Sequence, residues 1–280
     1  MTDVDRSALL AAYDSQLRRE AEVPSALSTT ELGPLILATY QGGRGFITYR
    51  DLATAAGPAT EESVRDLVAG ALEHYRGDPV VMSVEWKTRG HDHAPGLHEA
   101  LLAAGFEAED PESVMIGEAG LLAVDVELPV GVEIRRATTE DEVARVEQVA
   151  GEIFGDEPER ITAQVAEVVA RFRRDPDFEV WFAEADGQVV TTGRLEPVEG
   201  TEFAGIWGGS TLPEFRGRGI YRALTAARAR SAIAHGKRWI NSDSTEFSRP
   251  ILERSGLVKV STTTPYVWKR GGQDDSQDTA

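Results

Sequence analysis

STLPEFRGRGIYRAL, residues 210–224, joins a predicted strand to a predicted helix. Gly217 and Gly219 let the backbone turn tightly and approach a ligand with no Cβ in the way. The helix that follows directs unpaired N–H groups and a partial positive charge outward, and Arg216 and Arg218 add guanidinium groups suited to phosphate oxygens. The stretch predicts a phosphate-binding loop; the alternative is a glycine-rich turn flanked by surface arginines.

The common nucleotide-binding motifs do not account for this loop. No Gly-Lys-Ser or Gly-Lys-Thr follows the glycines, as a Walker-type loop requires. Arg222 stands where a dinucleotide-binding fingerprint needs its last glycine. We therefore expect the phosphate to belong to another kind of ligand.

Hydrophobic periodicity and turn signals predict two similar runs of elements on either side of Pro129. The first run has helices at 6–22, 60–77 and 95–104 and strands at 35–40, 46–49, 80–86 and 114–117. The second has helices at 140–149, 161–173, 220–235 and 249–254 and strands at 132–136, 179–184, 189–195, 203–211, 238–241, 258–262 and 266–269. Both runs place a tryptophan, a proline and a glycine in one order: Trp86, Pro95 and Gly105, then Trp239, Pro250 and Gly256. These patterns predict an α/β protein of two domains related by a diverged duplication.

The segment from Pro213 to Tyr221 resembles the signature of the GNAT superfamily of acyl-CoA-dependent N-acyltransferases, Arg/Gln-x-x-Gly-x-Gly/Ala after a strand. Tyr221 departs from the final small residue and places a ring at the helix start. The element order from Val132 to Trp268 also resembles that of the family, as does the closing segment 248–257. The resemblance implies that the loop holds the pyrophosphate of coenzyme A and that the preceding strand pairs with the pantetheine arm. The implied cofactor-binding residues are Ser210, Thr211, Arg216, Gly217, Arg218, Gly219, Ile220, Tyr221 and Ser248.

The same resemblance implies two GNAT-like domains, each with a mixed, mostly antiparallel central sheet flanked by helices. We expect a degenerate copy at residues 1–130, the catalytic domain at 131–270 and a disordered tail at 271–280. The glycine-rich segment 41–45 falls in a predicted hairpin, without the strand-to-helix context of a phosphate-binding loop. It is therefore interpreted as a structural turn.

The implied reaction transfers an acetyl group from acetyl-CoA to a primary amine. Such a reaction needs one group to take a proton from the amine and another to protonate the departing thiolate. Leu252 stands where the family often has a tyrosine, and Gly205 aligns near the position where some members carry a carboxylate. The substitute catalytic candidates are Asp243, Glu246 and Glu202, each with the alternative of a solvated surface carboxylate.

Aromatic residues give further candidates for the site. Tyr266 is a candidate acid for the thiolate, although a tyrosine on an alternating strand is usually half buried in a core. Trp207 and Trp181 are candidates for the wall of an acceptor pocket, with core packing as the alternative.

Composition limits the partners. The chain has 29 Lys and Arg against 47 Asp and Glu, a net charge of −18, which argues against nucleic-acid binding. The same charge favours a cationic acceptor, such as a polyamine, an aminoglycoside-like sugar or a lysine side chain, although acidic surfaces also simply keep proteins soluble. No oligomeric state is predicted.

The sequence predicts neither a metal nor a membrane. The chain has no cysteine, which excludes a thiolate nucleophile and cysteine-ligated zinc. His91, His93 and His98 invite a metal site, but the polar loop that holds the first two fits a strand-to-helix turn, and no metal is expected. No apolar run approaches the roughly 18 residues of a membrane span, and the N-terminus does not resemble a signal peptide, so we expect a cytoplasmic protein.

Two alternatives to an N-acetyltransferase stay open at this point. One is a catalytically silent acyl-CoA-binding or regulatory protein, which the missing tyrosine favours. The other is an enzyme of the same fold that uses a CoA thioester for decarboxylation or for transfer to oxygen.

Overall fold

The computed structural model describes residues 5–271. These residues form two compact units, one at Met115–Lys259 and the other at Asp5–Val114 together with the chain from Val260 onward. The units differ from the expected domains, 1–130 and 131–270, because residues 115–130 group with the second half and the segment after Lys259 groups with the first. The predicted tail, 271–280, lies outside the described residues apart from Gly271.

Strand β12 (Val258–Lys269) explains why the last segment groups with the first half of the chain. Its residues from Thr263 to Lys269 pair antiparallel with β4 (Ser83–Arg89), and Tyr266 and Val267 also pair with β5 (Glu107–Ala108). The sequence predicted two short strands here and assigned both to the second half. That assignment was wrong because alternation along a strand shows which residues face a core, not which distant strand is its neighbour.

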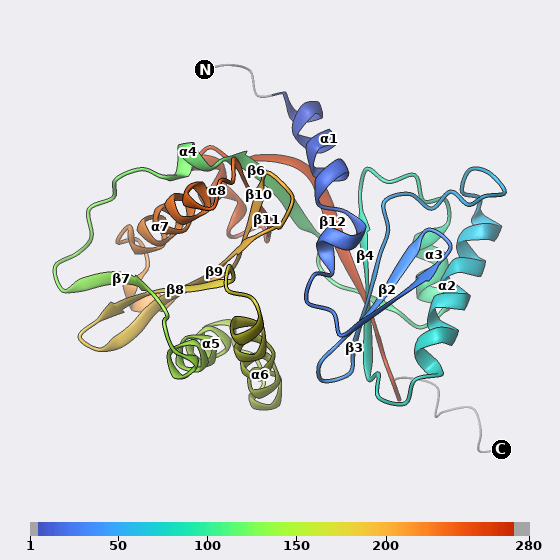
Figure 1. Cartoon of the computed structure of the whole chain (residues 1–280), viewed down its shortest axis with the longest axis horizontal. Helices are drawn as coiled ribbons and strands as arrows, with labels where there is room; N and C mark the ends of the chain where they lie inside the picture. The colour runs from blue at the N-terminus through green and yellow to red at the C-terminus, as the bar shows by residue number, and fades with distance from the viewer. Residues whose placement is uncertain (1–4, 272–280) are drawn as a thin grey trace. The chain divides into compact units, whose positions relative to one another are not determined.

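The unit at Met115–Lys259 contains a sheet with the strand order β6-β11-β10-β9-β8-β7. Strands β10 and β11 are parallel, and the pairs β7–β8, β8–β9 and β9–β10 are antiparallel. Figure 1 shows α7 and α8 on one side of these strands and α5 and α6 on the other. The strands are β6 (Glu112–Glu118), β7 (Val132–Arg136), β8 (Glu179–Ala185), β9 (Gln188–Pro197), β10 (Phe203–Thr211) and β11 (Trp239–Ser244). The helices are α4 (Ala119–Leu122), α5 (Glu140–Phe154), α6 (Pro158–Arg174), η2 (Pro213–Phe215), α7 (Ile220–Ala234) and α8 (Arg249–Arg254).

Local sequence explains most of these elements. The Thr139 side chain caps α5 by accepting the Glu142 N–H at 3.2 Å, and Pro158 opens α6. Asp186 and Gly187 both have positive φ, as the tight β8–β9 turn requires. Apolar residues of α5 and α6 pack on Val180 and Phe182 of β8, while those of α7 and α8 pack on the opposite face. The sheet therefore has two covered faces, which we call the α5/α6 face and the α7/α8 face.

The unit formed by the first half and the end of the chain has the strand order β1-β2-β3-β4-β12, with β3 and β4 parallel. Its other elements are α1 (Arg6–Gln16), η1 (Arg19–Glu22), β1 (Ser28–Leu32), β2 (Leu35–Tyr40), β3 (Arg44–Thr48), α2 (Glu61–Arg76) and α3 (Leu97–Ala103). The helix predicted over 6–22 is interrupted after Gln16, and Arg19 has a φ of 61° that no helix accommodates. Strands β1 and β5 and helix α4 were not predicted, because they are short and carry little periodicity.

Both units contain a parallel strand pair joined by a helix, β3–α2–β4 in one and β10–α7–β11 in the other. Each pair lies in a mixed sheet flanked by helices, which confirms the predicted fold class. Within residues 5–271, no helix is both long enough and apolar enough to cross a membrane.

Candidate functional site

The predicted phosphate-binding loop connects β10 to α7, as the sequence indicated. Gly217 and Gly219 have φ values of 73° and 79°, and Gly219 is the N-cap residue of α7. A Cβ at Gly217 would meet no atom within 4 Å, and one at Gly219 would meet only Val126, at 3.7 Å. Glycine is therefore favoured at both positions because φ is positive, and not because a Cβ would clash with neighbouring atoms.

The loop offers donors for an anion. No side chain caps α7, and the first helical bond runs from the Ala223 N–H to the Gly219 carbonyl, so the N–H groups before Ala223 point out of the helix start. Arg216 is exposed and donates its Nε–H to the Thr211 carbonyl at 3.0 Å, and Arg218 lies over the Phe215 ring. No carboxylate among residues 5–271 lies within ion-pair distance of either guanidinium group. These features fit the phosphates of coenzyme A.

A β-bulge interrupts β10 just before the loop. Trp207 pairs with Arg194 of β9 and Ser210 pairs with Thr192, so Gly208 and Gly209 together lie opposite one residue of β9. Gly208 has a φ of 61°. On the other side of β10, pairing with β11 extends only from Phe203 to Gly205, so the two strands diverge where the bulge begins.

Ser210 and Thr211 follow the bulge and are held by β9. The Ser210 and Thr192 hydroxyls lie 2.7 Å apart, and Thr191 donates its hydroxyl to Thr211 Oγ1 at 3.2 Å. Their side chains are therefore bonded within the sheet, and the Thr211 carbonyl already accepts the Arg216 Nε–H. Ser248, the other predicted cofactor residue outside the loop, is the N-cap residue of α8, and its hydroxyl donates to the Thr245 carbonyl at 3.3 Å.

A fully buried arginine supports the bulge from the α7/α8 face. Arg228 donates from Nη1 to the Arg194 carbonyl at 3.2 Å, and a Cβ on Gly193 would lie 2.6 Å from that nitrogen. Burial lowers the pKa of Arg228. The Tyr221 ring, where the family signature has a small residue, lies against Gly209, whose absent Cβ would be 2.7 Å from the ring. The tyrosine therefore faces the bulged strand and is accommodated by a glycine there.

The α5/α6 face beside the bulge carries a cluster of polar side chains that the sequence did not predict. Its members come from α5, α6, β9, β10 and β11, and we call it the polar cluster: Glu147, Arg171, Arg194, Glu196, Trp207 and Asn241. Arg171 forms an ion pair with Glu196 at 2.9 Å, and Arg194 Nε lies 3.9 Å from Glu147 Oε1. Glu147 could have been found from sequence, because it stands among the apolar positions Val143, Val146 and Ala150 of its helix.

The three predicted catalytic carboxylates are not brought together. Asp243 lies on β11, two residues after Asn241 and therefore on the α5/α6 face. Glu246 is exposed beyond β11 and forms an ion pair with Arg249 at 2.9 Å. Glu202 is exposed and precedes β10, at the end of the strand opposite to the phosphate-binding loop.

The aromatic candidates also separate. Leu252 is buried among the apolar residues of the α7/α8 face, so no acid occupies the family's tyrosine position. Tyr266 belongs to the other unit, where its hydroxyl lies 2.7 Å from His98 Nδ1. Trp181 donates to Glu179 at 2.6 Å on the α7/α8 face, whereas Trp207 lies over Gly205 on the α5/α6 face.

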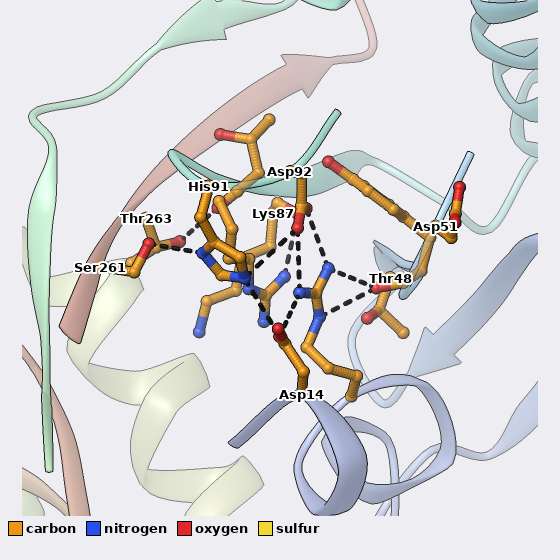
Figure 2. Close-up of polar contacts among 12 residues, drawn as sticks. Asp14, Thr48, Asp51, Lys87, His91, Asp92, Ser261 and Thr263 are labelled. Carbon is orange, nitrogen blue, oxygen red and sulfur yellow. Dashed lines mark hydrogen bonds and ion pairs between the residues drawn. The ribbon is translucent and has the colours of Figure 1, made fainter. Parts of the chain in front are cut away.

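The other unit has no such loop at the equivalent place. Its β3-to-α2 connection, residues 49–60, has no Gly-x-Gly, and β3–β4 pairing ends at Ile47 and Trp86. Beyond that point the buried Arg18 donates from Nε and Nη2 to the Tyr49 carbonyl, at 3.1 and 2.8 Å. Asp92 pairs with the same guanidinium at 2.9 Å, as does Asp14 (Figure 2). An arginine of this unit thus satisfies the strand's free carbonyl where its two strands diverge.

The histidines proposed as metal ligands have separate partners. His91 lies 2.6 Å from Ser261 Oγ and 3.1 Å from Asp14 Oδ1 (Figure 2), while His98 contacts Tyr266. Within the part of the chain that the structure describes, no group of three His, Cys, Asp or Glu residues is arranged to hold a metal ion.

Comparison with known proteins supports the assignment of the loop. Residues 143–253 match the acetyltransferase (GNAT) family model. A GCN5-related N-acetyltransferase from Kribbella flavida is 19% identical, with a TM-score of 0.62 over 95% of each chain. A functionally unknown conserved protein from Staphylococcus epidermidis is 14% identical, with a TM-score of 0.66 over 87% of this chain and 94% of its own. A tandem GNAT protein from the clavulanic acid biosynthesis pathway is 15% identical, with a TM-score of 0.60 over 87% of this chain and 80% of its own.

At these identities the solved structures establish a shared fold. No curated protein sequence matches the chain. The family match covers the bulge and the β10–α7 loop, and this loop is the feature that the sequence singled out. Residues 143–253 therefore form a domain that matches the acetyltransferase (GNAT) family, and the chain shares its fold with solved GNAT structures.

Proposed function

We propose that this protein is an N-acetyltransferase that binds acetyl-CoA at the β10–α7 connection and acetylates a primary amine. The observation that carries the proposal is the combination of a bulged β10, which diverges from β11, with an uncapped helix start and two exposed arginines that form no ion pair within residues 5–271. When bound, acetyl-CoA supplies an activated acetyl group as a thioester. The residues of the chain would bind and orient acetyl-CoA and would accept a proton from the amine.

The binding roles follow from position. The N–H groups between Gly217 and Tyr221 would hold the pyrophosphate, and Arg216 would add a charged hydrogen bond to it. The backbone of Gly208 to Thr211 has no strand partner on the β11 side among the described residues, so it can pair with an extended amide-bearing arm. The other unit, with Arg18 bonded to the Tyr49 carbonyl, is proposed to be a degenerate copy that does not bind CoA.

The acceptor is proposed to be a cationic small molecule or a lysine side chain. The net charge of −18 and the position of Asp243 beside the diverging strands support this choice. Asp243→Asn should raise KM for such an amine and leave CoA affinity unchanged. Glu246 and Glu202 stay candidates for attracting the cation from the surface, since both are exposed.

A silent CoA-binding protein is the second candidate. The buried Leu252 favours it, because the position that often supplies the acid holds a core side chain. The two candidates differ in one measurement: both bind CoA, and only the enzyme releases thiol from acetyl-CoA in the presence of an amine. The mass of the product separates amine acetylation from decarboxylation or transfer to oxygen.

The loop is tested by Arg216→Ala. A hydrogen bond from an arginine to a phosphate contributes roughly 1.5 to 3 kcal/mol, so CoA affinity measured by calorimetry should fall by about 10- to 150-fold. Arg174→Ala is the matched control, since Arg174 is also exposed and also donates its Nε–H to a backbone carbonyl. Equal affinities of both variants and the unmodified protein would place the phosphate site elsewhere.

A further inference from the structure

The polar cluster on the α5/α6 face has a feature that packing alone does not explain. The Oδ1 atom of Asn241 is buried and has no hydrogen-bond partner among residues 5–271, and the whole residue is only 6% exposed. A buried acceptor without a donor costs free energy, so such atoms in native proteins call for a ligand, a water or a functional role.

The strand register shows where this atom lies. Asn241 pairs with Gly205 on the parallel side, and Glu196 pairs with Gly205 on the antiparallel side. Paired residues share a face, so both side chains flank a position that has no side chain of its own. The Trp207 indole lies over Gly205.

Glu147 adds a carboxylate near Arg194 and Glu196 of β9. It projects from α5, is 5% exposed, and approaches Arg194, whose guanidinium would lie 3.0 Å from a Cβ on the bulge residue Gly208. Burial raises the pKa of Glu147, while Arg194 acts in the opposite direction and Glu196 reinforces the rise. The other groups facing the cluster are Gln164 and Arg171 of α6 and Asp243 of β11.

We propose that Glu147 and Asn241 hold the amino group of the acceptor, and that Glu147 takes its proton. This inference rests on the proposed acetyltransferase function. It identifies a catalytic base in a chain that has Gly205 near the position where some family members carry a carboxylate. Carboxylate and amide oxygens are both acceptors, and an ammonium group presents only donors. The indole of Trp207 offers a face on which a cation can rest. The site lies where β10 and β11 diverge, beside the bulge.

The proposed step balances as follows. The ammonium gives one proton to the Glu147 carboxylate, and the freed nitrogen lone pair forms a bond to the acetyl carbon of bound acetyl-CoA. The carbon–sulfur bond breaks and its electron pair leaves with sulfur. The second nitrogen proton passes through solvent to the thiolate, and Glu147 returns its proton to solvent when the product leaves.

The first experiment compares Glu147→Gln with the unmodified protein. Acetyl-CoA turnover with spermidine should fall by about 10²- to 10⁴-fold in kcat, the acid limb of the pH profile should disappear, and CoA affinity should not change. Glu184→Gln is the matched control. Glu184 lies on β8 of the same unit and is a half-buried carboxylate that forms an ion pair with Arg145. This variant should keep the activity and the pH profile of the unmodified protein.

The second experiment needs no turnover. Spermidine binding to the CoA-loaded protein is measured by calorimetry for the unmodified chain, Glu147→Gln and Asn241→Leu, with folding checked by circular dichroism. The site predicts a loss of about 10- to 150-fold in affinity for Glu147→Gln and a smaller loss for Asn241→Leu. Binding without acetylation would refute the proposed function and keep the site. Absent binding, or equal binding by all three proteins, would overturn the site.

Discussion

Glu142 is a carboxylate at the start of α5 whose pKa is lowered to about 2. The main cause is the Thr138 N–H, which donates to Glu142 Oε2 at 2.7 Å, and an ion pair with Arg135 adds to it. Hydrogen bonds to the charged form and an opposite charge both favour ionisation. The carboxylate therefore stabilises the fold only while it is charged.

The pH dependence of stability follows from this residue. Because the pKa in the folded state lies below the ordinary value of 4.5, the unfolded chain binds the proton first, and stability falls as pH drops from about 4.5 to about 2. Glu142→Gln should lower the free energy of unfolding above this window and flatten its slope within it, as measured by urea unfolding across the acid range. Glu133→Gln, which removes an exposed carboxylate on β7, should keep the slope. An unchanged slope in Glu142→Gln would contradict the assignment.

Arg18 and Arg228 show how surroundings give one residue type two roles. Arg18 is buried between Asp14 and Asp92. Burial acts to lower its pKa, but the hydrogen bonds that Arg18 donates to Asp92 raise it above the ordinary value. Arg228 is buried without a carboxylate among the described residues and bonds carbonyl groups beside the bulge. The first arginine completes a charged network, and the second holds backbone in place.

At the scale of elements, the packing of α7 on β10 depends on a glycine and a ring. A Cβ on Gly209 would lie 2.7 Å from Tyr221 Cε2 and 2.8 Å from its hydroxyl. Gly209→Ala should therefore destabilise the protein by about 1–3 kcal/mol through overpacking. In a Tyr221→Ala background the same change should cost much less, because the ring is gone.

A double-mutant cycle measures this coupling. Urea unfolding of both single variants and the double variant should show an interaction free energy of about 0.5–3 kcal/mol. Additive losses would show that the ring moves away freely, and that the tyrosine in the signature position does not constrain the bulged strand.

At the scale of the whole molecule, the last strand belongs to the unit that begins the chain. Trp268 is 6% exposed and packs in the core formed by α2, α3 and the β2–β4 strands. Trp268→Ala should cost roughly 3–5 kcal/mol. Because this core is separate from those of the Met115–Lys259 unit, hydrogen exchange should speed up in β4 and α2 while β10 and β11 keep their protection.

Phe203→Ala provides the reciprocal control. Phe203 is fully buried in the Met115–Lys259 unit, so its loss should expose β10 and β11 to exchange and leave β4 protected. If Trp268→Ala increased hydrogen exchange in β10 as much as in β4, the two units would unfold together. That result would contradict the prediction that the last strand stabilises one unit alone.

Most of the features that the sequence predicted depend on residues close together in the chain. The positive φ of Gly217 and Gly219, the strand-to-helix context of the loop and the Asp186-Gly187 turn depend on local backbone conformation, which neighbouring residues set. The order of most elements followed from the same local signals, and the resemblance of residues 213–221 to the family signature implied the GNAT fold.

Pairing between distant segments decided the rest. Glu196 and Asn241 flank Gly205 only because β9 and β11 pair with β10 in one register, and a shift of one residue would turn them to the opposite face. The bulge at Gly208 and the placement of Tyr266 in the other unit have the same origin. Local sequence carries no information on register between strands far apart in the chain, so the glycine conformations of the β10–α7 loop were predictable and the assembly of the polar cluster beside it was not.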